Sequence, residues 1–282
     1  MFENITIVGV GLIGGSFALA MKDKGIAKKA IGVTRSESSA KRALDLGLID
    51  EALPLKEAVA KSDLIYISIP VDTTIDTTLQ VLDIINDKQI VLDAGSTKDA
   101  LCKAIADHPK RKRFVATHPM WGTEYSGPEA AVHGAFEGRA CVICEKEKSD
   151  SDAVTTVEDI YKKIGMNLVY MDAKAHDVHA AYVSHISHIT SFALANTVLE
   201  KEREEDAIFE LAGGGFASTV RLAKSNPAMW VPIFMQNREN VLDVLNEHIS
   251  QLRKFKASLE KENAEYLTEL MENANKIKRI IK

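Results

Sequence analysis

The first 170 residues alternate short apolar runs with helical stretches. Apolar runs that predict strands lie at residues 5–8, 30–33, 64–69, 90–93 and 114–117. Stretches that predict helices lie between them, at residues 14–24, 73–85 and 97–106. Strands that alternate with helices at this spacing form a parallel sheet with both faces covered. The pattern therefore predicts an α/β domain, whose sheet is completed by late strands at residues 140–144 and 167–170.

The pattern changes after Met171, where strand-like runs cease. Helical stretches follow at residues 174–201, 217–224, 227–247 and 248–282. Asn226 and Pro227 supply a helix cap and a first-turn proline. Three consecutive glycines at residues 213–215 interrupt the helices and predict a loop or a close approach of two segments. We therefore expect two domains, residues 1–171 and 172–282, of which the second is entirely helical.

Composition and charge exclude several classes of protein. Of the 282 residues, 46% are hydrophobic and 27% are charged, the balance of a globular enzyme rather than of a disordered chain. The net charge of −5 argues against a nucleic-acid-binding protein, and the basic run at residues 110–113 is predicted to be a solvated turn. No apolar stretch reaches the roughly 20 residues of a membrane span, and the N-terminus shows no signal peptide. We therefore expect a cytoplasmic enzyme without nucleic-acid or membrane partners.

The cysteines indicate a reducing compartment. Cys102, Cys141 and Cys144 are too few, and odd in number, for a disulfide framework. Cys141 and Cys144 have the spacing of a CxxC pair, but they lie in a predicted strand. Residues three apart on a strand face opposite sides of the sheet. A shared metal or redox role for these two thiols is therefore not expected.

A glycine pattern follows the first predicted strand. Gly9, Gly11 and Gly14, with Leu12 and Ile13 between them, form a GxGxxG sequence that opens the first helix. In this context the first glycine permits a tight turn, the second lets backbone approach a pyrophosphate, and the third lets helix pack on strand. The helix N-terminus then stabilises the anion. The pattern predicts a dinucleotide site, and the alternative is a glycine-rich turn that binds nothing.

The end of the second predicted strand bears on the choice of cofactor. NAD-specific sites usually place Asp or Glu here to bind the ribose 2′-hydroxyl. This chain has Thr34, Arg35 and Ser36 instead. Because Arg35 and Ser36 can receive a 2′-phosphate, NADP is slightly favoured over NAD. The alternative is that Arg35 stacks on the adenine or lies in solvent.

Three further side chains are candidates for chemistry. His118 follows the strand at 114–117 and Ser96 follows the strand at 90–93, so both face the crevice where such sheets bind ligands. His118 is predicted to exchange a proton, and Ser96 to hydrogen-bond either His118 or a substrate hydroxyl. The alternatives are a structural histidine and a helix N-cap. Arg221 offers a planar fork for a carboxylate, or alternatively points into solvent.

Four histidines lie close together in the helical half: His176, His179, His185 and His188. On one continuous helix, at about 100° per residue, the first two lie roughly opposite the last two, so four ligands cannot converge on a metal. Ser184 and His188 share a face, with His185 adjacent. We interpret these three as a polar patch facing a cleft, and we predict no metal site. For each histidine alone, a satisfied structural role is an equal alternative.

Five motifs in family order resemble those of the prephenate dehydrogenase family, which includes the arogenate dehydrogenases. They are residues 9–16, 95–98, 118–122, 184–188 and 219–227. The resemblance implies an oxidoreductase of tyrosine biosynthesis that converts prephenate to 4-hydroxyphenylpyruvate and CO₂, with hydride transfer to NAD(P). The alternative within the family is an arogenate, or cyclohexadienyl, dehydrogenase that forms tyrosine directly. The resemblance further implies a Rossmann-like N-terminal domain and an all-α C-terminal domain, similar to that of 6-phosphogluconate dehydrogenase, that forms a homodimer.

The resemblance also assigns roles to residues at matching motif positions. His118 matches the catalytic histidine that hydrogen-bonds the ring hydroxyl, and Ser96 matches a serine that supports it beside the cofactor. The other matches concern the substrate. Arg221 and His188 match positions that hold carboxylates, Ser184 and His185 match positions that line the cleft, and Glu124 and Trp230 match positions near the site.

Two positions depart from the family pattern, and two other interpretations compete with it. Thr34 replaces the usual acid, which argues against a strict preference for NAD, and Ser218 replaces an acid that some members place near Arg221. One competing interpretation is another Rossmann-plus-helical dehydrogenase, such as a 3-hydroxyacid dehydrogenase or an imine reductase, with Lys174 or Lys224 as its lysine. The other is a regulatory protein that senses NAD(P) without turnover. Such a protein would not need the candidate catalytic groups.

Overall fold

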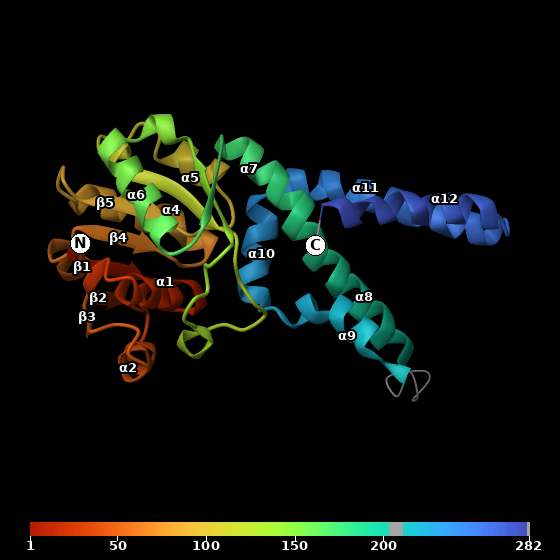
Figure 1. Ribbon diagram of the computed structural model, residues 1–282, viewed down its shortest axis with the longest axis horizontal. Coiled ribbons are helices and arrows are strands. Elements are labelled where there is room, and N and C mark those ends of the chain that lie inside the picture. Colours follow the sequence, from red (N-terminus) through yellow and green to blue (C-terminus); the bar gives the residue numbers. More distant parts are fainter. Residues whose placement is uncertain (203–210, 281–282) are drawn as a thin grey trace. The chain divides into compact units, whose positions relative to one another are not determined.

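The computed structural model describes residues 1–202 and 211–280 (Figure 1). The chain forms two compact units, Met1–Asn237 and Arg238–Lys282. In the first unit, eight strands among the described residues form one sheet in the order β3-β2-β1-β4-β5-β6-β7-β8. The strands are β1 (Phe2–Val8), β2 (Ala27–Val33), β3 (Glu51–Ala52), β4 (Leu64–Ile67), β5 (Ile90–Asp93), β6 (Phe114–Pro119), β7 (Ala140–Cys144) and β8 (Asn167–Met171).

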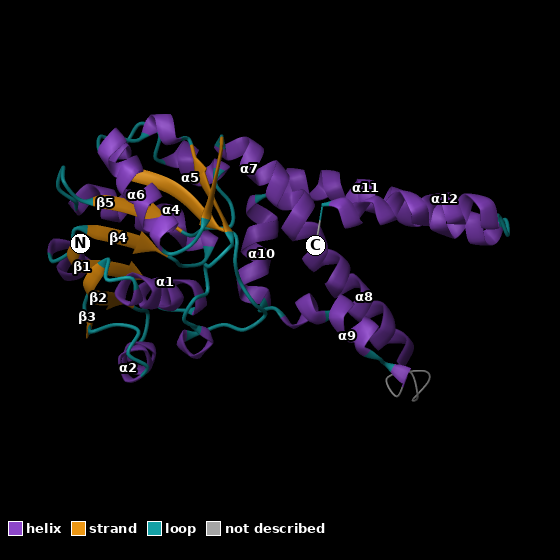
Figure 2. Cartoon of the chain, in the orientation of Figure 1, coloured by secondary structure: helices purple, strands orange, loops and turns teal. Residues whose placement is uncertain are grey.

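Helices cover both faces of this sheet (Figure 2). Side chains of α1 (Leu12–Asp23) and α6 (Ser151–Lys163) join the core on one face. Side chains of α4 (Val71–Ile84) and α5 (Asp99–Ala104), and Val59 of α3 (Leu55–Ala60), join the core on the other. A further helix, α2 (Glu37–Asp45), follows β2. The helices and strands named from the sequence pattern did not include α2, α3, α6 or the short strand β3.

The apolar strands predicted from the sequence are buried on both faces, as parallel strands covered by helices must be. In β4, Leu64 and Tyr66 pack into one core, whereas Ile65 and Ile67 pack into the other. The same alternation places Cys141 in the first core and the thiol of Cys144 in the second. The prediction that these two cysteines face opposite sides of the sheet is therefore confirmed.

One strand runs against the others. β7 pairs antiparallel with β6, whereas the remaining pairs among the described strands are parallel. A parallel neighbour needs a crossover across the face of the sheet, usually through a helix. The described segment between β6 and β7 contains only the short 3-10 turn Pro128–Ala130, so the chain returns beside β6 in the opposite direction. The sheet is thus mostly rather than wholly parallel.

The rest of the first unit is helical, and part of it packs on the sheet domain. α7 (Ala173–Ala180), a π-helical turn (Ala181–His185) and α8 (Ile186–Glu202) follow one another without a break. After the segment that is not described come α9 (Gly214–Thr219), a 3-10 turn (Arg221–Lys224) and α10 (Pro227–Gln236). α7 contacts α5, and α10 contacts α4, so the first compact unit extends beyond residue 171.

Capping residues explain where α9 and α10 begin, and the start of α9 differs from what the three glycines predict. Asn226 caps α10, because its side chain accepts a hydrogen bond from Ala228 N at 3.0 Å, and Pro227 occupies the first turn. Gly213 caps α9, whereas Gly214 and Gly215 lie in its first turn. An added Cβ on either would meet none of the described atoms within 4 Å. The predicted loop or close approach at these two glycines is therefore wrong.

The second unit contains α11 (Arg238–Glu260) and α12 (Ala264–Asn275), which pack against each other. Asn263 caps α12 by accepting a hydrogen bond from Tyr266 N at 3.0 Å. The sequence pattern had placed a single helix from Pro227 to residue 247, but α10 ends at Gln236 and α11 begins at Arg238. Among the described residues, no helix has the length and apolar character that crossing a membrane requires.

The basic run at residues 110–113 is not a solvated turn. Arg111 and Arg113 are each only 6% exposed. Arg111 donates to the backbone oxygen of Phe114 at 2.9 Å, and Arg113 donates to Asp152 at 2.8 Å. Both arginines thus bind the amino end of β6 to neighbouring segments. The predicted solvated turn is wrong because hydrogen bonds and ion pairs offset the cost of burying the two charges. A cavity of about 610 Å³ beside Arg111 lies at this end and is lined by none of the predicted site residues.

Candidate active site

The glycine loop between β1 and α1 is shaped by close backbone contacts. Gly9 has φ of +91°, and a Cβ there would lie 2.5 Å from the backbone oxygen of Ser68. A Cβ on Gly14 would lie 2.1 Å from the backbone oxygen of Gly9. Ser68, which the sequence analysis missed, donates from its hydroxyl to that same oxygen at 2.8 Å. Only glycine therefore fits at these two positions.

The open side of this loop suits an anion. Gly11 is the N-cap of α1, and a Cβ there would meet no described atom within 4 Å. No side chain of the described residues caps the helix, and no acidic residue lies in its first turn, which contains Leu12 and Ile13. Unpaired N–H groups at a helix N-terminus attract phosphate. The loop therefore fits the pyrophosphate of a dinucleotide.

The end of β2 carries no carboxylate at the ribose position. Thr34 donates from its hydroxyl to the backbone oxygen of Ser36 at 3.1 Å. Ser36 caps α2, because its hydroxyl accepts a hydrogen bond from Ser39 N at 3.2 Å. Arg35 is exposed and makes no ion pair with the described residues. Its guanidinium is therefore available beside the predicted adenosine ribose.

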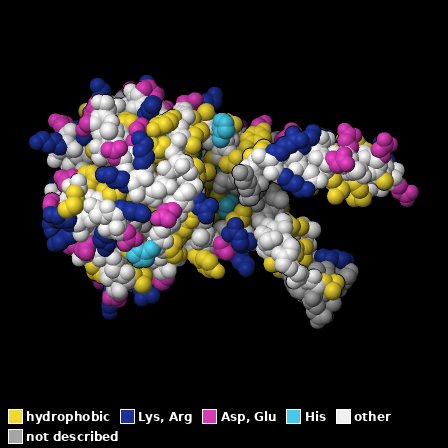
Figure 3. Space-filling view, in the orientation of Figure 1, with side chains coloured by type: hydrophobic (Ala, Val, Ile, Leu, Met, Phe, Trp, Pro, Cys, Tyr) yellow, Lys and Arg dark blue, Asp and Glu magenta, His cyan; other side chains and the backbone are white. Residues whose placement is uncertain are grey.

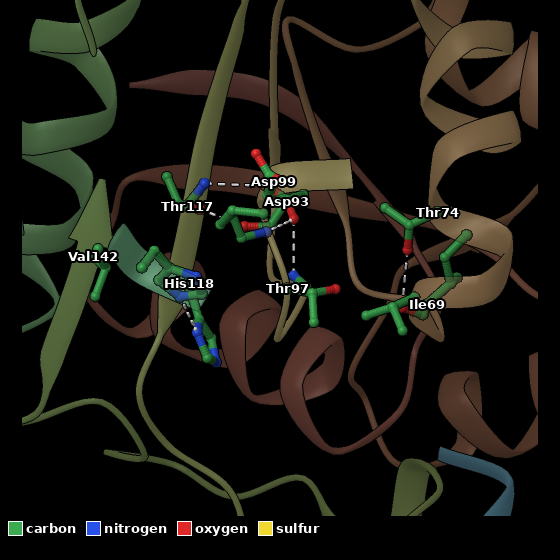
Figure 4. Close-up of polar contacts among 12 residues, drawn as sticks. Ile69, Thr74, Asp93, Thr97, Asp99, Thr117, His118 and Val142 are labelled. Carbon is green, nitrogen blue, oxygen red and sulfur yellow. Dashed lines mark hydrogen bonds and ion pairs between the residues drawn. The ribbon is translucent and has the colours of Figure 1, made fainter. Parts of the chain in front are cut away.

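A buried carboxylate ties together the carboxyl ends of β5 and β6 (Figure 4). Asp93 accepts hydrogen bonds from Gly95 N at 2.8 Å and from Thr117 N at 3.0 Å. It also pairs with the ammonium of Lys98, and both side chains are fully buried. Since Thr117 precedes His118, this network fixes the strand end that carries the candidate base.

His118 is held from the interior side rather than by Ser96. Its Nδ1 lies 2.8 Å from Nε2 of His176, and the imidazole is only 9% exposed. Burial lowers the pKa of His118 well below its usual value, and His176, Lys98 and His185 lower it further. Ser96 is half-buried and forms no hydrogen bond with the described residues, so the expected bond to His118 is not formed. Ser96 is not a helix N-cap either, because Lys98 occupies that position of α5.

A π-helical turn changes which histidines share a side. On one regular helix, as predicted from the sequence, His176 lies opposite His185. The π turn at Ala181–His185 adds a residue to one turn and so rotates the following residues relative to α7. His176 and His185 are each 1% exposed, and both lower the pKa of His118. The predicted opposition of these two side chains is therefore wrong, while no three metal-ligating side chains come together within the described part of the chain.

The helical segments contribute a cluster of aromatic rings, two of which carry hydrogen-bond donors without a partner among the described residues. The His188 ring stacks on Trp230 with ring centroids 3.4 Å apart, and His185 meets the same indole edge-on at 6.0 Å. Asn237 donates to Nδ1 of His185 at 3.2 Å, so the ring proton lies on Nε2. Among the described residues, neither that Nε2 nor Nε1 of Trp230 has a partner, although both are buried. Unpaired buried donors are costly and indicate a site that a ligand acceptor completes.

Charge and burial set the protonation of these two histidines. Burial lowers the pKa of His185 to about 4, although Asp177 acts in the opposite direction. Burial also lowers the pKa of His188, and the nearby Arg221 adds to this effect. His188 donates from Nδ1 to the backbone oxygen of Ser184 at 3.1 Å. Both rings are therefore neutral at pH 7, and Ser184 acts here through its backbone.

Arg221 joins the site from the 3-10 turn that follows α9. It donates to Glu124, on the segment after β6, at 2.8 Å. The Arg221 side chain is 50% exposed and the Glu124 side chain 13% exposed, so the Arg221 side chain stays accessible despite this ion pair. Ser218, the position where some relatives carry an acid, donates instead to the backbone oxygen of Gly215. The carboxylate partner of Arg221 thus comes from the sheet domain.

Comparison with known proteins relates this chain to one family. Residues 17–170 match the family model described as the prephenate dehydrogenase nucleotide-binding domain, and residues 172–273 match the prephenate dehydrogenase dimerization domain. The prephenate dehydrogenase of Bacillus subtilis is 33% identical over 271 residues, which cover 95% of this chain and 73% of the relative. The cyclohexadienyl dehydrogenase of Zymomonas mobilis is 28% identical and covers 100% of this chain and 97% of the relative.

A solved structure extends the similarity to the whole fold. The prephenate dehydrogenase from Aquifex aeolicus, in complex with hydroxyphenyl propionate and NAD+, superposes with a TM-score of 0.89 at 33% identity, covering 99% of this chain and 98% of the other. The chain belongs to the prephenate dehydrogenase family. The family, the fold class and the enzyme class predicted from the sequence are thereby confirmed.

Several residues of this family member escaped the sequence analysis. The sequence pattern gives His176 a structural role or a rejected role as a metal ligand, and it gives Asp177 and Asn237 none. Asp177 accepts hydrogen bonds from Lys98 N at 2.7 Å and from Asp99 N at 3.0 Å. Asn237 donates to the backbone oxygen of Asp177 at 2.7 Å. These contacts join segments far apart in the chain, and the only local signal was the adjacent His-Asp pair on a predicted helix.

Proposed function

We propose that the protein oxidises prephenate to 4-hydroxyphenylpyruvate with loss of CO₂, passing a hydride to a nicotinamide dinucleotide in tyrosine biosynthesis. The observation that carries the proposal is that the site holds one nitrogen able to accept a proton and two buried N–H groups able to donate hydrogen bonds. Nε2 of His118 is free to accept a proton, whereas Nε2 of His185 and Nε1 of Trp230 are buried donors without partners among the described residues. A molecule with a hydroxyl at one end and carboxylates at the other satisfies both sets.

The residues fit the chemistry in three ways. His118, neutral because burial lowers its pKa, accepts the hydroxyl proton while the hydride leaves the same carbon. Loss of the ring carboxylate as CO₂ then leaves an aromatic ring, so decarboxylation needs little acid catalysis. Arg221 holds a carboxylate, His188 does so once its bare Nε2 takes a proton, and Ser96 lies near the reacting hydroxyl. When bound, the nicotinamide supplies the hydride acceptor, and the protein supplies orientation and charge complementarity.

The cofactor is proposed to be NAD(P), with NADP slightly favoured over NAD. Gly9, Gly11 and Gly14 form the phosphate loop, and Arg35, exposed and without an ion-pair partner among the described residues, is available to a 2′-phosphate. The ratio of kcat/KM for the two cofactors checks this proposal. Arg35→Ala is expected to raise the KM for NADP about 10-fold and to leave the KM for NAD nearly unchanged, because one charge-assisted contact is lost. Equal effects on both cofactors would contradict it.

The assembly is proposed to be a homodimer formed through the helical part. The matched dimerization domain covers residues 172–273. On α11, Leu242, Ile249, Leu252 and Leu259 recur at intervals that place them on one stripe, and they are 36–65% exposed. Hydrophobic side chains are visible on the surface of the pair formed by α11 and α12 (Figure 3). An exposed apolar stripe of this kind marks an interaction surface. Light scattering is expected to give a dimer, and Leu252→Glu with Leu259→Glu is expected to give monomer.

A four-way assay tests the activity. The purified protein is mixed with prephenate or arogenate and with NAD or NADP, and the absorbance of the reduced nicotinamide is followed. Turnover with prephenate, releasing CO₂ and 4-hydroxyphenylpyruvate, is the expected result. Turnover with arogenate alone would assign the related arogenate activity instead. No turnover with either substrate would contradict the proposal.

A further inference from the structure

Three side chains form a chain of contacts that runs from the candidate base into the interior. Nδ1 of His118 lies 2.8 Å from Nε2 of His176, and Nδ1 of His176 lies 2.8 Å from Oδ1 of Asp177. The three residues are 9%, 1% and 4% exposed. The proposed function assigns a role to His118 alone. His176 therefore contacts the base and Asp177 contacts His176, and neither has an assigned role.

The direction of each hydrogen bond follows from the chemistry of the groups. A carboxylate only accepts, so His176 donates from Nδ1 to Asp177. In a neutral His176, Nε2 then carries no proton and accepts from Nδ1–H of His118. This arrangement holds neutral His118 in the tautomer whose Nε2 is unprotonated. The hydrogen bonds of His118 to the described side chains involve its Nδ1, which leaves Nε2 for a substrate.

Asp177 is fixed from outside its own helix. Its carboxylate accepts the backbone N–H groups of Lys98 and Asp99, which lie at the start of α5, at 2.7 and 3.0 Å. Its backbone oxygen accepts from Asn237 at 2.7 Å. The carboxylate therefore cannot turn away from His176 without breaking bonds to a second element. A positive charge on His176 would lie beside this carboxylate, whereas a charge on His118 would lie near Lys98 and His185, which both disfavour it.

We propose that His118, His176 and Asp177 form a proton relay, in which His176 and Asp177 are positioning residues for the base. The relay rests on the proposed function and extends it. As Nε2 of His118 takes the hydroxyl proton, the substrate O–H bond breaks and an Nε2–H bond forms. The Nδ1–H bond of His118 breaks in turn, and an Nε2–H bond forms on His176. The positive charge ends on the His176 imidazolium, paired with Asp177, and the proton returns by the same route.

The tautomer can be tested without turnover, by nitrogen NMR of the imidazoles in the full-length protein without cofactor. In the wild type, His118 is expected to be protonated at Nδ1 and bare at Nε2. His176→Gln, whose amide oxygen still accepts, is expected to keep this tautomer. His176→Phe is expected to shift His118 toward protonation at Nε2. A wild-type His118 protonated at Nε2 would overturn the relay and would leave the proposed substrate untouched.

Kinetics with prephenate and NAD(P) separate positioning from proton transfer. His176→Phe is expected to lower kcat about 10²-fold, the low end of the range for acid–base catalysis. His176→Gln is expected to lower kcat about 10-fold, because it keeps the tautomer but takes no proton. The KM for prephenate is expected to stay within about 2-fold in both, since neither residue contacts the substrate. His179→Gln, an exposed change on the same helix, is the matched control and retains kcat. Wild-type kcat in the Phe variant, or equal kcat in the Phe and Gln variants, would overturn the proposal.

Discussion

The nucleotide end and the chemical end of this site are built in different ways. At the nucleotide end, backbone makes the site, because Gly9 and Gly14 leave no room for a side chain and Gly11 opens α1. At the chemical end, side chains from distant segments make it: His118 bonds His176 across 58 residues, and Arg221 pairs with Glu124 across 97. The first end depends on sterics and the second on buried hydrogen bonds. Substitutions at the nucleotide end should therefore change stability and the KM for the dinucleotide, whereas substitutions at the chemical end should change kcat or the KM for the substrate.

The largest expected effect is at the chemical end. His118→Asn removes the base while preserving a polar side chain of similar size. We expect kcat to fall about 10²–10⁴-fold, the range for a lost general base. Steady-state kinetics at saturating cofactor measure this change, and His179→Asn serves as an exposed control. Near-normal turnover would show that the sheet end does not supply the base.

At the nucleotide end, Gly14→Ala and Gly11→Ala form a matched pair. In the Gly14→Ala variant the added Cβ would collide with the backbone oxygen of Gly9, and backbone does not yield cheaply. We expect a loss of about 3 kcal/mol in the free energy of unfolding, the upper part of the usual range for overpacking. Gly11→Ala meets open space, so stability should hold while the KM for the dinucleotide rises. Urea unfolding and cofactor titration check both, and equal stabilities for the two variants would contradict the steric account.

The buried histidines of the chemical end predict how stability depends on pH. The pKa of His185 is about 4 in the folded protein because of burial, against 6.5 ordinarily. Between these values the unfolded chain binds a proton that the folded chain excludes, so the free energy of unfolding falls as pH falls from 6.5 to 4. This one group accounts for at most about 3 kcal/mol. Urea unfolding of His185→Gln should show a smaller loss between pH 7 and pH 4.5, and a loss equal to that of wild type would contradict the assignment.

Arg221 should give the smallest of these effects. Its side chain is half exposed and its guanidinium is already paired with Glu124, so a substrate carboxylate gains only part of its charge. We expect Arg221→Ala to raise the KM for prephenate about 10-fold with little change in kcat, because the contact is made in ground and transition state alike. Arg35→Ala is the control and should change the KM for NADP only. An unchanged KM for prephenate would show that the arginine does not hold the substrate.

The same contrast explains what the sequence revealed. The strands, the glycine loop and the caps at Asn226 and Pro227 depend on local pattern, and the structure contains them. The antiparallel β7 depends instead on a connection without a crossover helix, which apolar runs do not show. Arg111 and Arg113 were misjudged because local pattern does not reveal acceptors brought close by folding.

At the chemical end, single residues could be predicted from the sequence, but the contacts between them could not. His118 and Arg221 were found by motif, and the structure places His118 in β6 and pairs Arg221 with Glu124. The partner of His118 was missed because His176 lies 58 residues away on another element, and the placement of His185 was missed because a π turn follows α7. A single extra residue in one turn carries no apolar or charge signature. The Glu124 partner of Arg221 was likewise invisible, since the pair joins two segments 97 residues apart.

The central claim is that one substrate molecule contacts both His118, at the end of β6, and the donors of the helical segments, which are Arg221, His185 and Trp230. A crystal structure with 4-hydroxyphenylpyruvate and the oxidised dinucleotide tests it most directly. The account predicts the phenol oxygen within hydrogen-bond distance of Nε2 of His118, with the carboxylate toward Arg221, His185 and Trp230. A product bound at only one of these two ends, or with its phenol away from His118, would contradict it.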